Sequence, residues 1–337
     1  MKSNMIKKII ALALLVPVVL TGCSETAAKS SDNENNSDGS KDDKMYKIGI
    51  SQLQEHPSLD QAREGFIDGL KELGVAAEVD YVNAQGDIAN TQIISEKFVK
   101  DKADMIYSIA TLSAQSAKQA VKGTDIPVVF SAVTDPVYSQ IVKSSSEIEN
   151  VTGVTDKVEV SEILKSAKDF KEGAEVIGII YNIGESNSEV QVEEVKAAAE
   201  KLGMKVETVG ITTVNDIPHA VNTLAKKIDV LYIISDNVVA SSISLVAKLC
   251  VENNIVTLST IESQAADGIL MSNGLNYYEL GKQAAEMAEK ILAGGADIKT
   301  IPVEQPSGLK KTVNVKTMEA LGLTKDNKAF EGAEFIE

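Results

Sequence analysis

The sequence has no tryptophan, and among its 337 residues it has only two histidines and two cysteines. One of these cysteines, Cys23, lies near the N-terminus, so Cys250 has no partner for a disulfide within the folded part and is expected to be a buried thiol. Acidic residues outnumber basic ones, 49 to 33, which gives a formal net charge of -16. A nucleic-acid partner is therefore not expected, since phosphates need a basic face.

Familiar catalytic motifs are missing too. There is no G-x-S-x-G elbow, Walker phosphate loop, H-E-x-x-H, C-x-x-C or dinucleotide G-x-G-x-x-G. Glu55 and His56 would be an acid–base pair in an enzyme, whereas in the alternative His56 caps the loop and Pro57 starts a helix at its favoured first turn. His219 lies early in a helical pattern, away from the expected site. We expect a binding protein rather than an enzyme, with no metal and no cofactor.

Long apolar runs are confined to the N-terminus. Lys2, Lys7 and Lys8 precede the stretch IIALALLVPVVL, which is too short to span a bilayer and leads into LTGC. This pattern predicts an export signal over residues 1–22, and LTGC resembles the lipobox in which the chain is cut before an acylated cysteine, here Cys23. The alternative is an ordinary signal peptide with an incidental cysteine.

Residues 23–44 combine Cys23 with a stretch of Ser, Asn, Asp and Lys that has no large apolar side chain. Such a composition predicts a disordered tether with a reach of roughly 25 Å. The predicted location is the outer face of the cytoplasmic membrane, at the cell surface, with a lipid anchor through Cys23. Arg63 is the only arginine, and this lysine bias fits an AT-rich, Gram-positive source.

From residue 45 onward, short apolar runs alternate with amphipathic stretches. The first half predicts strands at 46–52, 77–84, 103–110 and 126–132, with helices at 58–74, 87–100 and 113–123 between them. Strands that alternate with helices indicate parallel sheets covered on both faces. The predicted fold class is therefore α/β, with doubly wound parallel sheets.

The chain repeats this plan. Residues 47–74 align without a gap on residues 176–203, which places Gly49 opposite Gly178 and Gly74 opposite Gly203. We therefore expect two lobes, each an open α/β sheet. In open parallel sheets the ligand site lies beyond the carboxyl ends of the strands. The polar segments at those ends, which predict a cleft between the lobes, are 54–57, 111–113, 131–136, 181–188, 236–237 and 259–262.

Several motifs in matching order carry a family resemblance. EHP, NAQGD, VTDP and DN, together with the stretches around them from Tyr46 to Leu323, resemble the ABC-transporter substrate-binding proteins that include tryptophan- and tyrosine-binding lipoproteins. The resemblance implies a type I periplasmic-binding fold, with a three-stranded hinge and closure around a small molecule. It also implies that lobe one comprises residues 45–154 and 275–298 and lobe two residues 155–274 and 299–337. The partners that it implies are an amino-acid ligand and a membrane ABC permease encoded elsewhere; we assume a monomer.

An amino-acid zwitterion would need three kinds of group. Its carboxylate would take N–H groups at a helix start, near Thr111 and Ser113. Its ammonium would take Asp236, or as second choice Asp135, although Asp-Pro is also common in turns. The expected ligand-binding residues are Glu55, His56, Pro57, Thr111, Leu112, Ser113, Ser131, Thr134, Asp135, Tyr181, Asn182, Asn187, Ser188, Asp236, Asn237, Ser259, Thr260 and Glu262.

A ring on the ligand would need an apolar wall, and Tyr181, Pro57 and Leu112 are the candidates. Tyr107 and Tyr232 lie inside predicted strands and are expected in the core. The resemblance implies tyrosine as the ligand, followed by tryptophan or phenylalanine. The chain departs from the family pattern at LSTIESQAADG, around Ser259 to Glu262. The alternative function is that of a surface adhesin, which could coexist with ligand binding.

Overall fold

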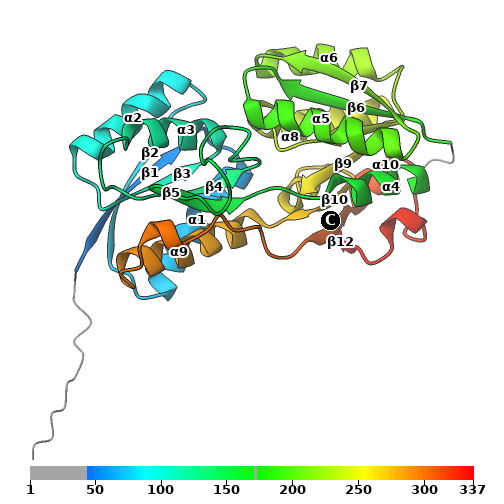
Figure 1. Ribbon diagram of the computed structural model, residues 1–337. Coiled ribbons are helices and arrows are strands. Elements are labelled where there is room, and N and C mark those ends of the chain that lie inside the picture. The colour runs from blue at the N-terminus through cyan, green and yellow to red at the C-terminus, as the bar shows by residue number, and fades with distance from the viewer. Residues whose placement is uncertain (1–43, 171–172) are drawn as a thin grey trace, which may run out of the picture. The chain divides into compact units, whose positions relative to one another are not determined.

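Two sheets, each covered by helices on both faces, account for residues 44–170 and 173–337, the part of the chain that the computed structural model describes (Figure 1). Cys23, the predicted signal peptide and residues 23–43 of the predicted tether lie outside the described residues. Within these ranges no helix is both long and apolar enough to cross a bilayer. The predicted α/β fold with two doubly wound sheets is confirmed.

The first sheet has the order β2-β1-β3-β4-β5, and every neighbouring pair is parallel. Helices α1 and α9 pack on one face of this sheet, and α2 and α3 pack on the other. The elements are β1 (Tyr46–Gln52), α1 (Pro57–Glu72), β2 (Ala77–Asn83), α2 (Ile88–Lys100), β3 (Met105–Ile109), α3 (Thr111–Ala120), β4 (Val128–Val133), β5 (Val151–Thr155) and α9 (Tyr277–Leu292).

The second sheet has the order β12-β11-β10-β9-β8-β6-β7, and its pair β10–β11 is antiparallel. Its elements are α4 (Val160–Phe170), β6 (Val176–Asn182), α5 (Ser186–Lys201), β7 (Lys205–Ile211), α6 (Ile217–Leu224), β8 (Val230–Ile233), α7 (Asn237–Ala240), α8 (Ile243–Glu252), β9 (Val256–Ile261), β10 (Met271–Leu275), β11 (Lys310–Asn314), α10 (Val315–Ala320) and β12 (Glu334–Ile336). Short 3-10 turns cover Val214–Asp216, Glu262–Ala265, Ile298–Thr300 and Lys328–Phe330.

The predicted internal repeat is visible in the strand orders. The first sheet reads β2-β1-β3-β4-β5 and the second contains β7-β6-β8-β9-β10, so the second repeats the first strand by strand and adds β11 and β12. Gly49 and Gly178 occupy equivalent places in β1 and β6. Gly74 and Gly203 follow α1 and α5 with φ of 71° and 67°, a left-handed conformation that ends a helix readily at glycine.

Helices α1 and α9 come into unusually close contact, as Figure 1 shows for the blue and orange helices under the first sheet. A Cβ atom at Gly65 would lie 1.9 Å from the Tyr278 carbonyl oxygen, and one at Gly281 would lie 2.1 Å from the Ala62 carbonyl oxygen. Glycine lowers helix propensity by about 1 kcal/mol relative to alanine. Here its lack of a side chain permits backbone-to-backbone packing and closes the core of lobe one.

The chain passes between the two sheets three times: after β5, after β10 and before β11. The lobe boundary was expected at residue 298, but the following segment is also bound to the first sheet. Thr152 Oγ1 donates to the Ile301 carbonyl at 2.9 Å, and Glu304 N donates to the Gly153 carbonyl at 2.9 Å. This segment forms only an isolated bridge with β5, which leaves no periodic signal in the sequence.

Candidate functional site

A small cavity lies between the lobes at the carboxyl ends of the strands. The space within it is about 10 Å³, the lower limit for one water molecule. Four predicted site residues, His56, Asn187, Asp236 and Asn237, line it. The other lining residues are Leu59, Ala132, Asp156, Ser235, Ala240, Ile261 and Tyr277.

Direct hydrogen bonds join the lobes beside this cavity. Gln54 Nε2 donates to the Asn237 carbonyl at 2.5 Å, and His56 Nε2 lies 3.3 Å from Asn237 Oδ1. A further contact, 3.2 Å between the hydroxyls of Ser139 and Ser186, joins the lobes elsewhere. Asn237 therefore contacts two residues of lobe one beside the cavity.

Two buried carboxylates organise the lobe-two wall. Glu185 Oε2 accepts hydrogen bonds from Asn237 Nδ2 at 2.5 Å and from Asn187 Nδ2 at 3.1 Å, and Oε1 accepts from Asn182 Nδ2 at 3.0 Å. Only 2% of the Glu185 surface is exposed. Glu185 was not among the predicted site residues, yet it orients three asparagines at once, two of which line the cavity.

Asp236 lies next to this network and caps α7. Its Oδ2 accepts from Ser188 Oγ at 2.7 Å and from Asn182 N at 2.5 Å, and its Oδ1 accepts from Val239 N at 2.9 Å. Burial, together with the negative charge of Glu185, raises the pKa of Asp236 to about 7, against these hydrogen bonds, which lower it. Both of its oxygens are thus already engaged with protein donors.

Glu55 and His56, directly before α1, lie in different surroundings. Glu55 is exposed and accepts a long hydrogen bond of 3.4 Å from Tyr81 Oη, whereas His56 is buried against Asn237. Burial lowers the pKa of His56 to about 4, although the hydrogen bond to Asn237 and the charge of Asp60 raise it. Pro57 occupies the first turn of α1, is exposed, and does not line the cavity.

Asp156 lies in the connection that follows β5, and its surface is only 4% exposed. Its Oδ2 accepts from Tyr277 Oη at 2.6 Å, while its buried Oδ1 has no hydrogen-bond partner among the described residues. Burial raises the pKa of Asp156, and the hydrogen bond from Tyr277 opposes that shift. Tyr277 begins α9, so this pair links two of the three connections between the lobes.

The start of α3 has the features expected of an anion site. Thr111 and Ser113 are buried there, and their hydroxyls have no partner within the described residues. Leu112 between them is half-buried. The preceding residue, Ala110, has a φ of 81°, a strained value for a residue with a side chain, which is often found at functional sites. None of the three predicted residues lines the small cavity itself.

The polar residues at the end of β4 and directly after it make different kinds of contact. Ser131 Oγ lies 2.5 Å from Tyr107 Oη in the core, and Thr134 Oγ1 accepts from Gln191 Nε2 at 3.5 Å across the lobes. Asp135 Oδ1 accepts hydrogen bonds from Val137 N and Tyr138 N, which is the turn structure that the Asp-Pro sequence offered as an alternative. Asp135 Oδ2 lies 3.5 Å from Lys157 Nζ. Asp135 therefore lies outside the cavity.

The remaining predicted residues of lobe two mostly bind their own loop. Ser259 Oγ donates to Gln264 Oε1 at 2.5 Å, and Glu262 accepts from Asn276 and Lys310. Thr260 is buried, and its hydroxyl lies near Tyr232. Tyr181 is half-buried against the core of lobe two and does not line the cavity.

Tyr107 and Tyr232 are buried in the cores of the lobes, as predicted. The aromatic ring at the cavity is instead that of Tyr277. Both Tyr277 and Asp156 follow strand ends, so the same positional rule would have found them. However, β5 (VTGVT) and β10 (MSNGL) are short and lack a continuous apolar run, so the sequence pattern does not mark them as strands.

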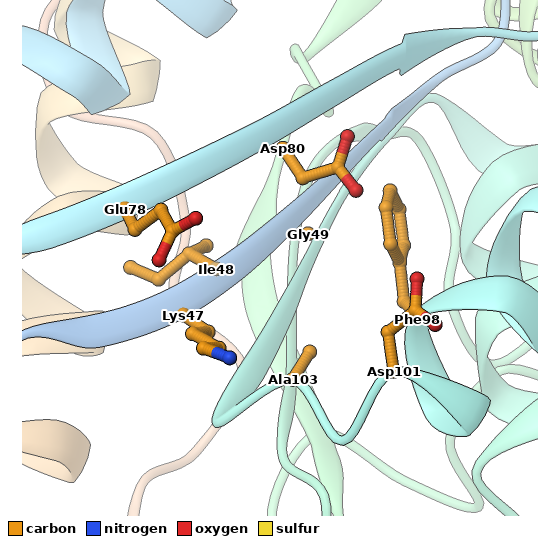
Figure 2. A pocket seen from close by; sticks show the side chains of 8 residues that line it. All are labelled: Lys47, Ile48, Gly49, Glu78, Asp80, Phe98, Asp101 and Ala103. Atoms are coloured by element: carbon orange, nitrogen blue, oxygen red, sulfur yellow. The ribbon is translucent and has the colours of Figure 1, made fainter.

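A larger hollow of about 370 Å³ lies on lobe one, near the start of β1 and away from the lobe interface (Figure 2). Figure 2 shows Glu78 and Asp80 on β2, with the ring of Phe98 from α2 lying over Gly49. Asp80 already pairs with Lys97, and Lys47 N donates to Asp104. Two of the acids that line this hollow, Asp80 and Asp101, are thus engaged by the Lys97 ammonium.

The described residues contain no group of three or more His, Cys, Asp or Glu side chains that could hold a metal ion. The cavity instead presents carboxylate, amide and imidazole groups beside one phenol ring. Such a set can bind a small polar molecule that carries a positive charge and hydrogen-bond donors.

Comparisons with known proteins agree on the type of protein. Residues 47–334 match the family described as ABC transporter substrate binding protein. A curated relative from Clostridioides difficile, described as "Tyrosine-binding protein", is 40% identical over 329 residues, which cover 96% of this chain and 94% of the relative.

Two solved structures share the fold. An ABC domain from Streptococcus pneumoniae in complex with L-Trp has a TM-score of 0.81 at 31% identity, covering 87% of this chain and 100% of that one. The ligand-free, open structure of a Clostridium difficile substrate-binding protein with adhesive properties has a TM-score of 0.67 at 40% identity, covering 87% and 99%. The chain is thus closer in sequence to the second structure and closer in shape to the first, in line with the direct hydrogen bonds between its lobes.

Proposed function

Because the chain belongs to the family of ABC transporter substrate-binding proteins, we propose that it captures an aromatic amino acid between its lobes, tyrosine before tryptophan or phenylalanine. The observation that carries this proposal is the cavity between the lobes, where buried polar groups meet the Tyr277 ring. Support for the ligand class comes from the relative described as tyrosine-binding and from the similarity to the L-Trp complex.

Capture would proceed by closure of the lobes. A ligand that contacts both lobes favours the closed arrangement only by its excess affinity for it. Gln54 and His56 on lobe one already bind Asn237 on lobe two, so closure adds protein contacts to the ligand contacts. The closed complex would then dock on a membrane ABC permease, and the ligand would pass on without chemical change.

The ligand is tested by thermal shift and calorimetry. The protein is unfolded and refolded to remove any carried ligand, and then screened against the twenty amino acids, nucleosides and simple sugars. A ligand at 100-fold excess over its dissociation constant adds about 2.7 kcal/mol to the free energy of unfolding. We expect shifts with tyrosine, tryptophan and phenylalanine, and a shift with sugars alone would refute the assignment.

Proteins of this family work outside the cytoplasm, and we propose that this one is held at the membrane by acylation of Cys23. Two acyl chains, at about 0.8 kcal/mol per buried methylene, give stable anchoring. Replacement of Cys23 by serine should move the protein from the membrane fraction to the medium, or leave it as an uncleaved precursor. An unchanged, detergent-extractable protein that takes up no labelled palmitate would contradict the anchor.

Adhesion is a second candidate function, because a related Clostridium difficile substrate-binding protein is described as having adhesive properties. A tethered position would allow both roles. Binding of the purified protein to host cells, measured with and without saturating ligand, separates them. Adhesion that persists when no amino acid binds would favour the adhesin as the main role.

A further inference from the structure

Three buried side-chain atoms around the cavity lack hydrogen-bond partners among the described residues. They are Asp156 Oδ1, Asn187 Oδ1 and His56 Nδ1. All three residues line the cavity, and their surfaces are only 4%, 3% and 6% exposed. Since more than about 90% of buried polar groups in proteins are paired, three such atoms around one cavity indicate a site built for a group that donates hydrogen bonds.

The surrounding hydrogen bonds fix these atoms as acceptors. Asn187 Nδ2 donates to Glu185 and to the Ser235 carbonyl at 2.9 Å, which leaves Oδ1 as the free end of the amide. Asn237 Nδ2 donates to Glu185 in the same way, so its Oδ1 faces His56 and can only accept. His56 therefore carries its proton on Nε2, and Nδ1 is a bare acceptor.

The charge at this site comes from Asp156. Two acids line the cavity, and the other, Asp236, has both oxygens engaged by Ser188, Asn182 and Val239. Asp156 Oδ2 accepts from Tyr277, whereas its Oδ1 has no hydrogen-bond partner among the described residues. The Thr134 and Ser235 hydroxyls lie near enough to lower the pKa of Asp156, against the effect of burial.

We propose that Asp156 is the counter-ion for the ligand's primary ammonium group, with Asn187 and His56 as the other two acceptors. A primary ammonium has three N–H donors, which matches the three free acceptors. The inference rests on the proposed function and replaces Asp236 and Asp135 in this role. His56 belongs to lobe one, Asn187 to lobe two and Asp156 to a connection between them, so the ammonium would bind all three parts and favour closure directly.

The test compares ligands with and without the amine. Calorimetry measures tyrosine and 3-(4-hydroxyphenyl)propionate, which lacks only the ammonium, on the wild type and on Asp156→Asn. Removing one partner of a buried charge pair weakens binding by about 30-fold or more. We expect Asp156→Asn to lose at least that much affinity for tyrosine and less than about 3-fold for the deaminated analogue, so that discrimination collapses.

Asp135→Asn is the matched control, since Asp135 lies outside the cavity and should keep full discrimination. If Asp156→Asn binds tyrosine with its preference over the analogue intact, the counter-ion assignment is wrong while the proposed function stands. If the wild type binds no amino acid at all, both fail.

A measurement on the wild type guards against a variant that does not fold. The ¹³C carboxyl resonance of Asp156 should move on addition of tyrosine and stay in place on addition of the deaminated analogue. A resonance that responds equally to both ligands overturns the assignment.

Discussion

His56 on lobe one and Asn237 on lobe two lie 3.3 Å apart, from Nε2 to Oδ1, and both are buried. Asn237 also accepts a hydrogen bond on its carbonyl from Gln54 and is itself held by Glu185. A histidine at a buried contact between lobes makes the folded protein sensitive to protons, because charging the ring there is costly.

The first prediction concerns stability at acid pH. Burial lowers the pKa of His56 from 6.5 to about 4. Between these values the unfolded chain binds a proton that the folded chain does not, so the free energy of unfolding falls as pH drops from about 6.5 to about 4. This difference amounts to about 3 kcal/mol. Urea unfolding from pH 7.5 to 4 should show a flatter pH dependence for His56→Gln than for the wild type.

His219→Gln is the control, since His219 is exposed on α6. It should leave the pH dependence as in the wild type. Parallel curves for His56→Gln and the wild type would rule out the predicted linkage.

The second prediction concerns the acid pair in lobe two. Burial and the charge of Glu185 raise the pKa of Asp236 from 3.8 to about 7. The folded state then holds a proton between these values that the unfolded state releases, so this group's contribution to stability is lost as pH rises from about 4 to about 7. Glu185→Gln removes one charge and should lower the pKa of Asp236.

The carboxyl resonance of Asp236, followed by ¹³C NMR against pH, reports this pKa directly. Glu189→Gln is the control, because Glu189 is exposed on α5, the helix that Glu185 directly precedes. This variant should leave the pKa of Asp236 unchanged. An Asp236 pKa that stays the same in Glu185→Gln would show that burial alone sets it.

The third prediction concerns the contact between α1 and α9. A side-chain methyl at Gly65 would lie 1.9 Å from a backbone oxygen of α9. Gly65→Ala should therefore lower the free energy of unfolding by about 1 to 3 kcal/mol, despite its better helix propensity. Glu64→Ala, one position away and exposed, should change it by less than about 0.5 kcal/mol. Equal stabilities of the two variants in urea would contradict close packing of the helices.

The fourth prediction concerns the hydrogen bond from Gln54 to Asn237. A net contribution of about 0.5 to 1.5 kcal/mol corresponds to about 2- to 12-fold in the closure equilibrium. Gln54→Ala should weaken ligand binding by that factor and increase the radius of gyration in solution scattering without ligand. Gln92→Ala, exposed on α2, is the control. A variant with unchanged scattering and affinity would show that this bond does not hold the lobes together.

The sequence was most informative about the sheets. Apolar strands and helices that end at glycine leave strong local patterns in the sequence. These patterns allow Gly49 to be matched with Gly178, 129 positions later, and the two glycines do lie in equivalent strands. Residues 301–304 use only their own backbone groups to bind β5, and such groups have no signature in side-chain type. The boundary after residue 298 could not be placed from pattern for that reason.

At the site, the strand-end rule pointed to the edge of each sheet at which the cavity lies. It could not tell which acids there are already paired: Asp135 binds its own turn, Asp236 caps a helix, and Asp156 keeps an oxygen free. Glu185 lay within a predicted segment, but its three asparagine partners are assembled only by the fold. Pairing depends on the three-dimensional arrangement, and this decides which polar residue remains available for a ligand.

The pairing of α1 with α9 also determines when the protein can fold. The ribosome makes residues 57–72 before residues 277–292, so the part of the α1 surface that packs on α9 stays uncovered until α9 has followed. The second sheet likewise waits for β11 and β12. Neither lobe can finish as an independent early unit, because lobe one waits for α9 and lobe two for β11 and β12. A chain that stops before residue 277 therefore leaves both lobes unfinished.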